Sequence, residues 1–147
     1  MSLEMHAREV EGILILDLQG RIVAGAEASE LRDRLTALAS QRNANVILNL
    51  QEIHYIDSTG LGILVVGHSS IKATGGALKL LHVSKRGAQL LILTKLATVF
   101  SIYDDEQSAI NSFFPDREVK HFDILEFVTS QEEGGQLGAS AAGKGQG

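Results

Sequence analysis

The most restrictive feature of the sequence is a short, β-branched and nearly unbroken apolar run at residues 46–50. A strand that faces solvent on one side alternates polar and apolar residues, whereas a run of this kind is typical of a strand covered on both faces. The run therefore predicts a strand at the centre of a sheet. The rest of the chain must supply the layers that cover it.

Segments with the period of an amphipathic helix alternate with further strand-like runs along the chain. The predicted helices cover residues 27–40, residues 60–74, a segment capped by Ser84, and a short segment that opens at residues 104–106 and stops at Pro115. The predicted strands, besides residues 46–50, are residues 77–83 and a segment around 99–103. This alternation predicts an α/β domain in which crossover helices join parallel strands.

The N-terminal segment predicts a different kind of pairing. Residues 3–8 alternate apolar and polar side chains, and the apolar run 13–18 follows after Glu11-Gly12. Two such runs joined by a short turn are typical of a hairpin. The sequence thus predicts a mixed sheet that begins with an antiparallel hairpin at its edge and continues with parallel strands.

The C-terminal part of the chain is less regular. Residues 116–129 fit a strand through Phe122, Ile124 and Val128, and fit a helix through Val119, Phe122 and Leu125, so the periodicity leaves both open. Residues 131–147 are rich in glycine and hold almost no large apolar side chain. They predict a disordered tail, which leaves residues 1–130 as the folded unit.

Composition and charge argue against several classes of protein. The net charge is −5 and no run of Lys and Arg stands out, which argues against direct binding to nucleic acid. The chain has no cysteine, and its five histidines have no metal-ligand spacing, so neither a metal nor another cofactor is predicted. The absence of a long apolar stretch predicts no membrane insertion and a cytoplasmic protein.

The most informative motif is residues 55–62, Tyr-Ile-Asp-Ser-Thr-Gly-Leu-Gly, directly after the predicted central strand. Asp57, Ser58 and Thr59 fall at the start of the next predicted helix, where side-chain oxygens satisfy free backbone donors. Read from chemistry alone, this cluster is a helix cap. The helix start also tolerates an added negative charge.

The order of elements, Gly20 at the end of the second strand, residues 56–62 and the segment after Gly75 together resemble the STAS domain of bacterial anti-sigma factor antagonists, over about residues 3–114. The resemblance implies that Ser58 is the phosphate acceptor of a partner anti-sigma factor serine kinase. It also implies a serine phosphatase as a further partner. The predicted partner-binding residues are Asp57, Ser58, Thr59, Gly60, Leu61, Gly62 and Arg21.

This resemblance predicts a binding protein that is switched by phosphorylation. A phosphate adds roughly 1.5 to 2 negative charges to a docking surface, which weakens an interface that has no cation to pair with it. ATP and magnesium would belong to the kinase, so the chain itself is predicted not to be an enzyme. In its unmodified form it would sequester the kinase and release a sigma factor.

One departure from the family pattern concerns the loop after the second strand. Family members often carry acidic residues directly after the strand-ending glycine, whereas this chain has Arg21 and Ile22 after Gly20. Arg21 is either a solvated surface residue or a cation that approaches a phosphate on Ser58. The altered loop favours an alternative function, a STAS scaffold that does not switch and serves a larger regulatory or transport complex.

Two further alternatives fit the sequence poorly. A phosphorelay receiver needs a pair of acids after its first strand to hold magnesium, and this region offers only Asp17 within a strand. A serine hydrolase would use Ser58 with His54 or His82 as base, but Ile56 occupies a position that the Gly-x-Ser-x-Gly elbow requires to be glycine.

Overall fold

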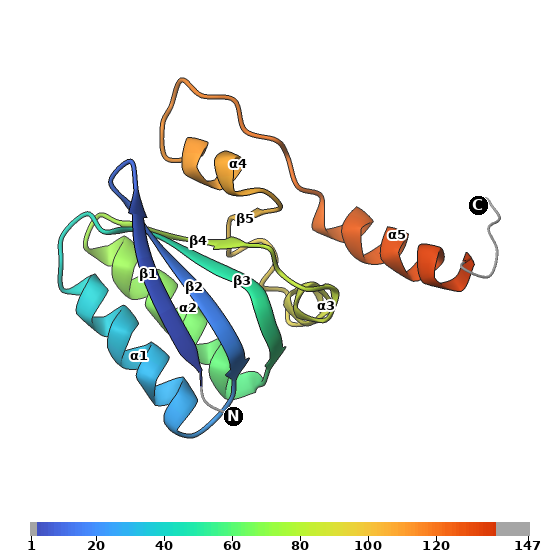
Figure 1. Ribbon diagram of the computed structural model, residues 1–147, viewed down its shortest axis with the longest axis horizontal. Helices are drawn as coiled ribbons and strands as arrows, with labels where there is room; N and C mark the ends of the chain where they lie inside the picture. Colours follow the sequence, from blue (N-terminus) through green and yellow to red (C-terminus); the bar gives the residue numbers. More distant parts are fainter. Residues whose placement is uncertain (1–2, 138–147) are drawn as a thin grey trace.

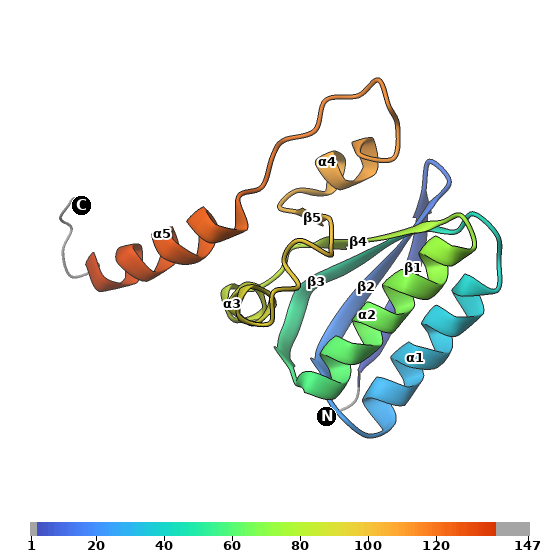
Figure 2. The ribbon, with the colours of Figure 1, turned by 180° about the vertical axis from the view of Figure 1, so that it is seen from behind.

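The computed structural model describes residues 3–137, with side chains described up to residue 130, and contains one sheet flanked by helices (Figure 1, Figure 2). The strands are β1 (Glu4–Val10), β2 (Ile13–Ile22), β3 (Asn45–Ile56), β4 (Ala77–Leu81) and β5 (Ile102–Tyr103). The helices are α1 (Ala26–Ala39), α2 (Ser58–Ala73), α3 (Lys85–Leu93), α4 (Glu106–Asn111) and α5 (Ile124–Leu137). The strands lie in the order β1-β2-β3-β4-β5.

The sheet is mixed in the way that the sequence predicts. β1 and β2 form an antiparallel hairpin, and β2, β3, β4 and β5 pair in parallel. Glu11 and Gly12 connect the hairpin with φ angles of 52° and 82°, the left-handed conformation that two-residue hairpin turns require. The predicted α/β fold class is confirmed.

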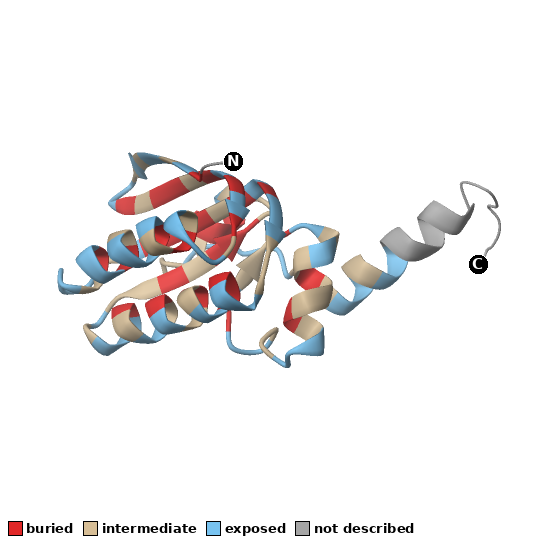
Figure 3. Ribbon diagram, turned by 90° about the horizontal axis from the view of Figure 1, so that it is seen from below, coloured by how far each residue is buried: buried red, intermediate tan, exposed pale blue. Residues whose placement is uncertain are grey.

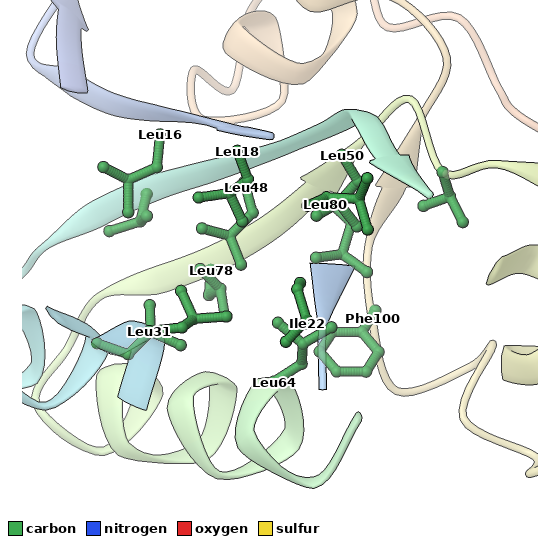
Figure 4. Close-up of a cluster of buried hydrophobic side chains, with 14 of the residues drawn as sticks. Leu16, Leu18, Ile22, Leu31, Leu48, Leu50, Leu64, Leu78, Leu80 and Phe100 are labelled. Atoms are coloured by element: carbon green, nitrogen blue, oxygen red, sulfur yellow. The ribbon is translucent and has the colours of Figure 1, made fainter. Parts of the chain in front are cut away.

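The main hydrophobic core lies between one face of the sheet and the helices α1, α2 and α3. Figure 4 shows leucines of β3 and β4, such as Leu48 and Leu80, pointing toward Leu64 of α2, and Figure 3 shows the buried stripes of the helices turned toward the sheet. Leu48 and Leu80 are both 0% exposed. The apolar run that begins at Val46 is therefore the interior strand that its pattern predicts.

The opposite face of the sheet has a smaller core. Side chains alternate between the two faces of a strand, so Ile13, Ile15 and Ile47 point away from α1 and α2. They pack with Ala109 and Ile110 of α4, which covers part of this second face. The strand β3 is thus covered on both sides where it crosses the sheet.

The C-terminal segment resolves the choice that periodicity leaves open. It forms the helix α5, which packs on the main core through Ile124, Phe127 and Val128, after an irregular segment at residues 115–123. The helix continues across the predicted boundary at residue 130 to Leu137, so the start of the predicted tail is helical. The remainder of that tail, residues 138–147, lies outside the described residues.

Candidate functional site

The motif at residues 57–62 lies where β3 ends and α2 begins, and Asp57 organises it. Asp57 is the N-cap of α2: its Oδ1 accepts a hydrogen bond from the Gly60 backbone N–H at 2.8 Å. Its Oδ2 accepts a second bond from the Ala24 backbone N–H at 2.9 Å, which ties the β2–α1 loop to the start of α2. Its own N–H donates to the Ile22 carbonyl at 3.2 Å. One residue, through its side chain and its backbone N–H, therefore joins the ends of two neighbouring parallel strands.

These contacts fix the charge of the cap. The backbone hydrogen bond from Ala24, followed by that from Gly60, lowers the pKa of Asp57 below its ordinary value. Hydrogen bonds to an ionised carboxylate favour the ionised form. Asp57 is thus a negative charge at neutral pH, and it occupies the helix N-terminus where the dipole favours such a charge.

Ser58 and Thr59 play a different part from the one that chemistry alone suggests. The sequence places all three polar residues at the cap, but only Asp57 caps α2; Ser58 and Thr59 are its first helical residues, and both are exposed. Among the described residues, none hydrogen-bonds to the Ser58 hydroxyl. The hydroxyl is therefore accessible and has no role in stabilising the turn.

The glycines and the leucine of the motif divide into buried and exposed positions. Gly60 and Leu61 are buried, and a Cβ atom on Gly60 would lie 2.2 Å from the Ile22 carbonyl oxygen. Gly62 is exposed, and a Cβ there would meet no atom within 4 Å. Gly60 and Leu61 thus position α2 against the sheet, whereas Gly62 belongs to the accessible surface beside Ser58.

Val66 is an accessible residue of this region that the sequence pattern assigns to an apolar run. It is 61% exposed, although it lies in the middle of α2. Residues four apart in a helix share a face, so Ser58, Gly62 and Val66 form one line along α2, which we call the α2 ridge. The spacing from Ser58 could have revealed this line in the sequence.

Arg21 is not brought beside Ser58. It pairs in register with Tyr55 of β3, and it is exposed while its neighbour Ile22 is 0% exposed against the main core. Since successive side chains of a strand point to opposite faces, Arg21 projects from the face of the sheet opposite α1 and α2. This placement favours the solvated surface arginine over a phosphate-binding role.

The comparison with known families identifies the family of this domain. The model of the STAS domain family matches residues 4–109 of this chain, from β1 into α4. This chain belongs to the STAS domain family. The irregular segment at residues 115–123 and the helix α5 lie beyond the part of the STAS domain that the family model matches.

Relatives of this STAS domain include an antagonist and solved structures of the same fold. The anti-sigma-B factor antagonist of Bacillus subtilis (strain 168) is 32% identical over 102 residues, which cover 69% of this chain and 92% of the relative. The crystal structure of an anti-sigma factor antagonist from Mycobacterium paratuberculosis aligns with a TM-score of 0.67 at 18% identity, over 76% of this chain and 93% of that one.

A second solved structure concerns a modified protein. The Bacillus cell fate determinant SpoIIAA in its phosphorylated form aligns with a TM-score of 0.60 at 17% identity, over 75% of this chain and 99% of that one. At such identities the two structures show the shared STAS fold.

The acid considered for a phosphorelay receiver has side-chain partners within the sheet. Asp17 is held within the sheet by Arg8, with Nε to Oδ2 at 2.6 Å, and by Asn49, with Nδ2 to Oδ1 at 2.8 Å. The bond from Arg8 lowers the pKa of Asp17. Within residues 3–137, where side chains are described up to residue 130, no three described His, Asp or Glu side chains are grouped to hold a metal ion. None of the helices in this range has the length and apolar character to cross a bilayer.

Proposed function

We propose that this STAS domain is an anti-sigma factor antagonist: unphosphorylated, it binds and sequesters an anti-sigma factor that is a serine kinase, and so releases a sigma factor. The observation that carries the proposal is the geometry of Ser58. Its hydroxyl is exposed at the first position of α2, beside a cap that Asp57 already satisfies. The antagonist named above, 32% identical to this chain, supports the same role.

The contact surface that we propose consists of the accessible residues around the start of α2. Ser58, Thr59 and Gly62 belong to it directly, and Val66 extends it along the α2 ridge. The open space over Gly62 allows a partner backbone to approach the helix closely. Gly60 and Leu61 support this surface from beneath.

The proposed switch is electrostatic. A phosphate on Ser58 would add roughly 1.5 to 2 negative charges next to the ionised Asp57 carboxylate. The first turn of α2 tolerates anions, so the fold would persist. A partner that docks on the ridge would face an unpaired and desolvated charge, and its affinity would fall. SpoIIAA, a protein of the same fold, has a structure in a phosphorylated form, which supports a fold that survives the modification.

In this proposal the chain is a substrate and partner and not an enzyme. The kinase supplies ATP and magnesium, and a serine phosphatase would restore the unmodified state. These partners place the protein in the cytoplasm. No described histidine hydrogen-bonds to Ser58, so the hydroxyl lacks the adjacent base that a nucleophile requires.

The experiment compares four forms of the full chain against the kinase recovered by pull-down from the source cells with unmodified protein. Titration calorimetry is run with wild type, Ser58→Ala, Ser58→Asp and protein phosphorylated by that kinase. Ser130→Asp, at an exposed position of α5, is the control. We expect Ser58→Ala to bind at least as well as wild type, and Ser58→Asp and phosphorylated protein to bind more weakly. The control should bind like wild type.

Phosphopeptide mapping gives a second readout. Modification at Ser58 supports the proposal, and modification of Thr59 or Ser84 with Ser58 untouched contradicts it. Equal affinities across all four forms would favour the scaffold alternative. The scaffold alternative is supported by Arg21, which stands where the family pattern has an acidic residue. It predicts a partner whose affinity is changed by Arg21→Glu and is unchanged by phosphorylation of this chain.

A further inference from the structure

The polypeptide that follows α4 contributes little to the interior of the domain. Every buried hydrophobic side chain that the structure describes lies at or before Ile110, and none of residues 115–130 is buried. The match to the STAS family model also ends before this segment, at residue 109. We call residues 115–130 the strap. The fully buried core of the STAS domain is therefore built before the strap begins.

The middle of the strap does not pack on the sheet. A cavity of about 480 Å³ lies between residues 100–103 at the sheet edge and residues 119–125 of the strap. Figure 1 and Figure 2 show the strap running outside the sheet from α4 to α5. The structure describes no backbone hydrogen bond from residues 115–130 to a strand. The strap thus bridges the sheet edge without joining the sheet.

Polar contacts hold the first part of the strap. The Arg117 Nη2 donates to the Glu11 Oε1 at 2.7 Å, at the hairpin turn, and both side chains are more than a third exposed. Further along, the Ser108 Oγ of α4 accepts from the Lys120 N–H at 3.0 Å. An exposed ion pair contributes little to stability, so this part of the strap is held largely by hydrogen bonds to α4.

Apolar contacts hold the second part of the strap. The helix α5 packs on α3, and its Ile124, Phe127 and Val128 contact the main core, but all three remain partly exposed. The rings of Phe122 and Phe127 also pack on each other, with their centroids 5.2 Å apart. The irregular part of the strap is thereby joined to α5, which couples the two parts.

We propose that the strap is a conformational unit that undocks from the STAS domain while the domain stays folded. Segments with few buried apolar contacts and with exposed hydrogen bonds open at a lower free energy than the whole protein unfolds. Undocking uncovers the side of α3 on which α5 packs, and the edge at β5, the last strand of the sheet. Proteins commonly cover such edges with a helix or loop. Docking of the strap therefore controls access to this edge, and the proposal does not depend on the function proposed for Ser58.

Native-state hydrogen exchange of the full chain, followed by NMR at increasing urea below the unfolding transition, tests the proposal. Two amides report on the strap: the Lys120 N–H, and the Phe127 N–H, which donates to the Asp123 carbonyl at 2.9 Å. Leu48, which pairs with both β2 and β4, reports on the sheet. We expect both strap amides to have the same opening free energy, with protection at least about a hundredfold below that of Leu48. Their protection should also depend less on urea, because undocking exposes less surface than global unfolding.

Three variants test whether the strap opens as one unit. Phe127→Ala removes an apolar contact with the core, so it should lower the protection of the Lys120 N–H by about tenfold, although Lys120 is in the irregular part. Arg117→Ala should lower the protection of the Phe127 N–H by about two- to fivefold, as expected for an exposed ion pair. Leu125→Ala is the control: Leu125 is 61% exposed, so protection at Lys120 should be unchanged.

Two results would overturn the proposal. One is equal protection of Phe127 and Leu48 with the same dependence on urea, because the strap would then open only when the whole domain unfolds. The other is a Phe127→Ala variant that loses protection in α5 and keeps it at Lys120, because α5 and the irregular part would then open separately. Circular dichroism of each variant establishes that it is folded.

Discussion

Replacement of Gly60 by alanine is expected to destabilise the domain, whereas the same replacement at Gly62 is expected to stabilise it. Both glycines lie in the first turns of α2, two residues apart, so backbone conformation and helix propensity are closely matched. They differ in what surrounds them. Gly60 is buried against the end of β2, and Gly62 faces open space.

The magnitude follows from the contacts of the added methyl group. At Gly60 it would lie 2.2 Å from the Ile22 carbonyl oxygen and 2.8 Å from the Ile22 Cγ2 atom, so the start of α2 must move by roughly an ångström. Overpacking of this kind costs about 1–3 kcal/mol, and weakening of the bond from Asp57 N–H to Ile22 adds up to about 1 kcal/mol. Alanine returns about 1 kcal/mol of helix propensity. The free energy of unfolding should therefore fall by up to about 3 kcal/mol, with about 1.5 kcal/mol at the middle of the range.

At Gly62 the methyl group meets nothing within 4 Å. Only the propensity gain remains, so the free energy of unfolding should rise by about 0.5–1 kcal/mol. Urea unfolding followed by far-UV circular dichroism measures both values. For a chain of this size Tm should fall by up to about 10 °C for Gly60→Ala and rise by about 1–3 °C for Gly62→Ala. A Gly60→Ala variant as stable as wild type, or a destabilised Gly62→Ala variant, would refute the reasoning.

Three further predictions test the cap, α5 and the tail. Because the pKa of Asp57 is lowered in the folded state, its contribution to stability is present above the ordinary value of 3.8 and is lost as pH falls below that value. When pH is lowered below 3.8, the free energy of unfolding should therefore decrease less steeply for Asp57→Asn than for wild type. Phe127→Ala should lower the free energy of unfolding by about 1–2 kcal/mol because Phe127 packs on the core. Leu125→Ala is the control: Leu125 is 61% exposed, so this variant should have nearly the stability of wild type. Equal losses of unfolding free energy at both positions in urea unfolding would contradict this prediction. Deletion of residues 131–147 should leave Tm almost unchanged in calorimetry, because the described contacts of α5 with the core end at residue 128; a drop of several degrees would move the boundary of the folded unit past residue 130.

Local pattern predicted most of the elements because it reports burial directly. The apolar run from Val46 to Leu50 predicts a covered strand, and β3 is buried there. The Glu11-Gly12 turn and the cap at Ser84 follow from chemistry within a few residues, and the Ser84 Oγ accepts from the Gly87 N–H at 3.0 Å. The position of residues 57–62 between strand and helix was evident for the same reason.

The C-terminal segment shows where pattern fails. Phe122, Ile124 and Val128 fit a strand as well as a helix, because a short window holds too few apolar residues to separate the two periods. The choice was made by the surface on which the segment packs, which includes α3. β3 likewise continues past its apolar run to Ile56, since pairing with β2 holds its polar end in the sheet.

In the candidate site, residue types near the start of α2 could be read from the sequence, whereas which of them caps the helix and which are exposed depends on the packing around that start. The bond from the Ala24 N–H to Asp57 joins residues 33 apart, a contact that depends on two parallel strands ending side by side. The same packing buries Gly60 and leaves Gly62 exposed. It also places Arg21 on the face of the sheet opposite the helices α1 and α2. Sequence spacing gives residue types at a helix start, but exposure and direction depend on the layers that pack around that start.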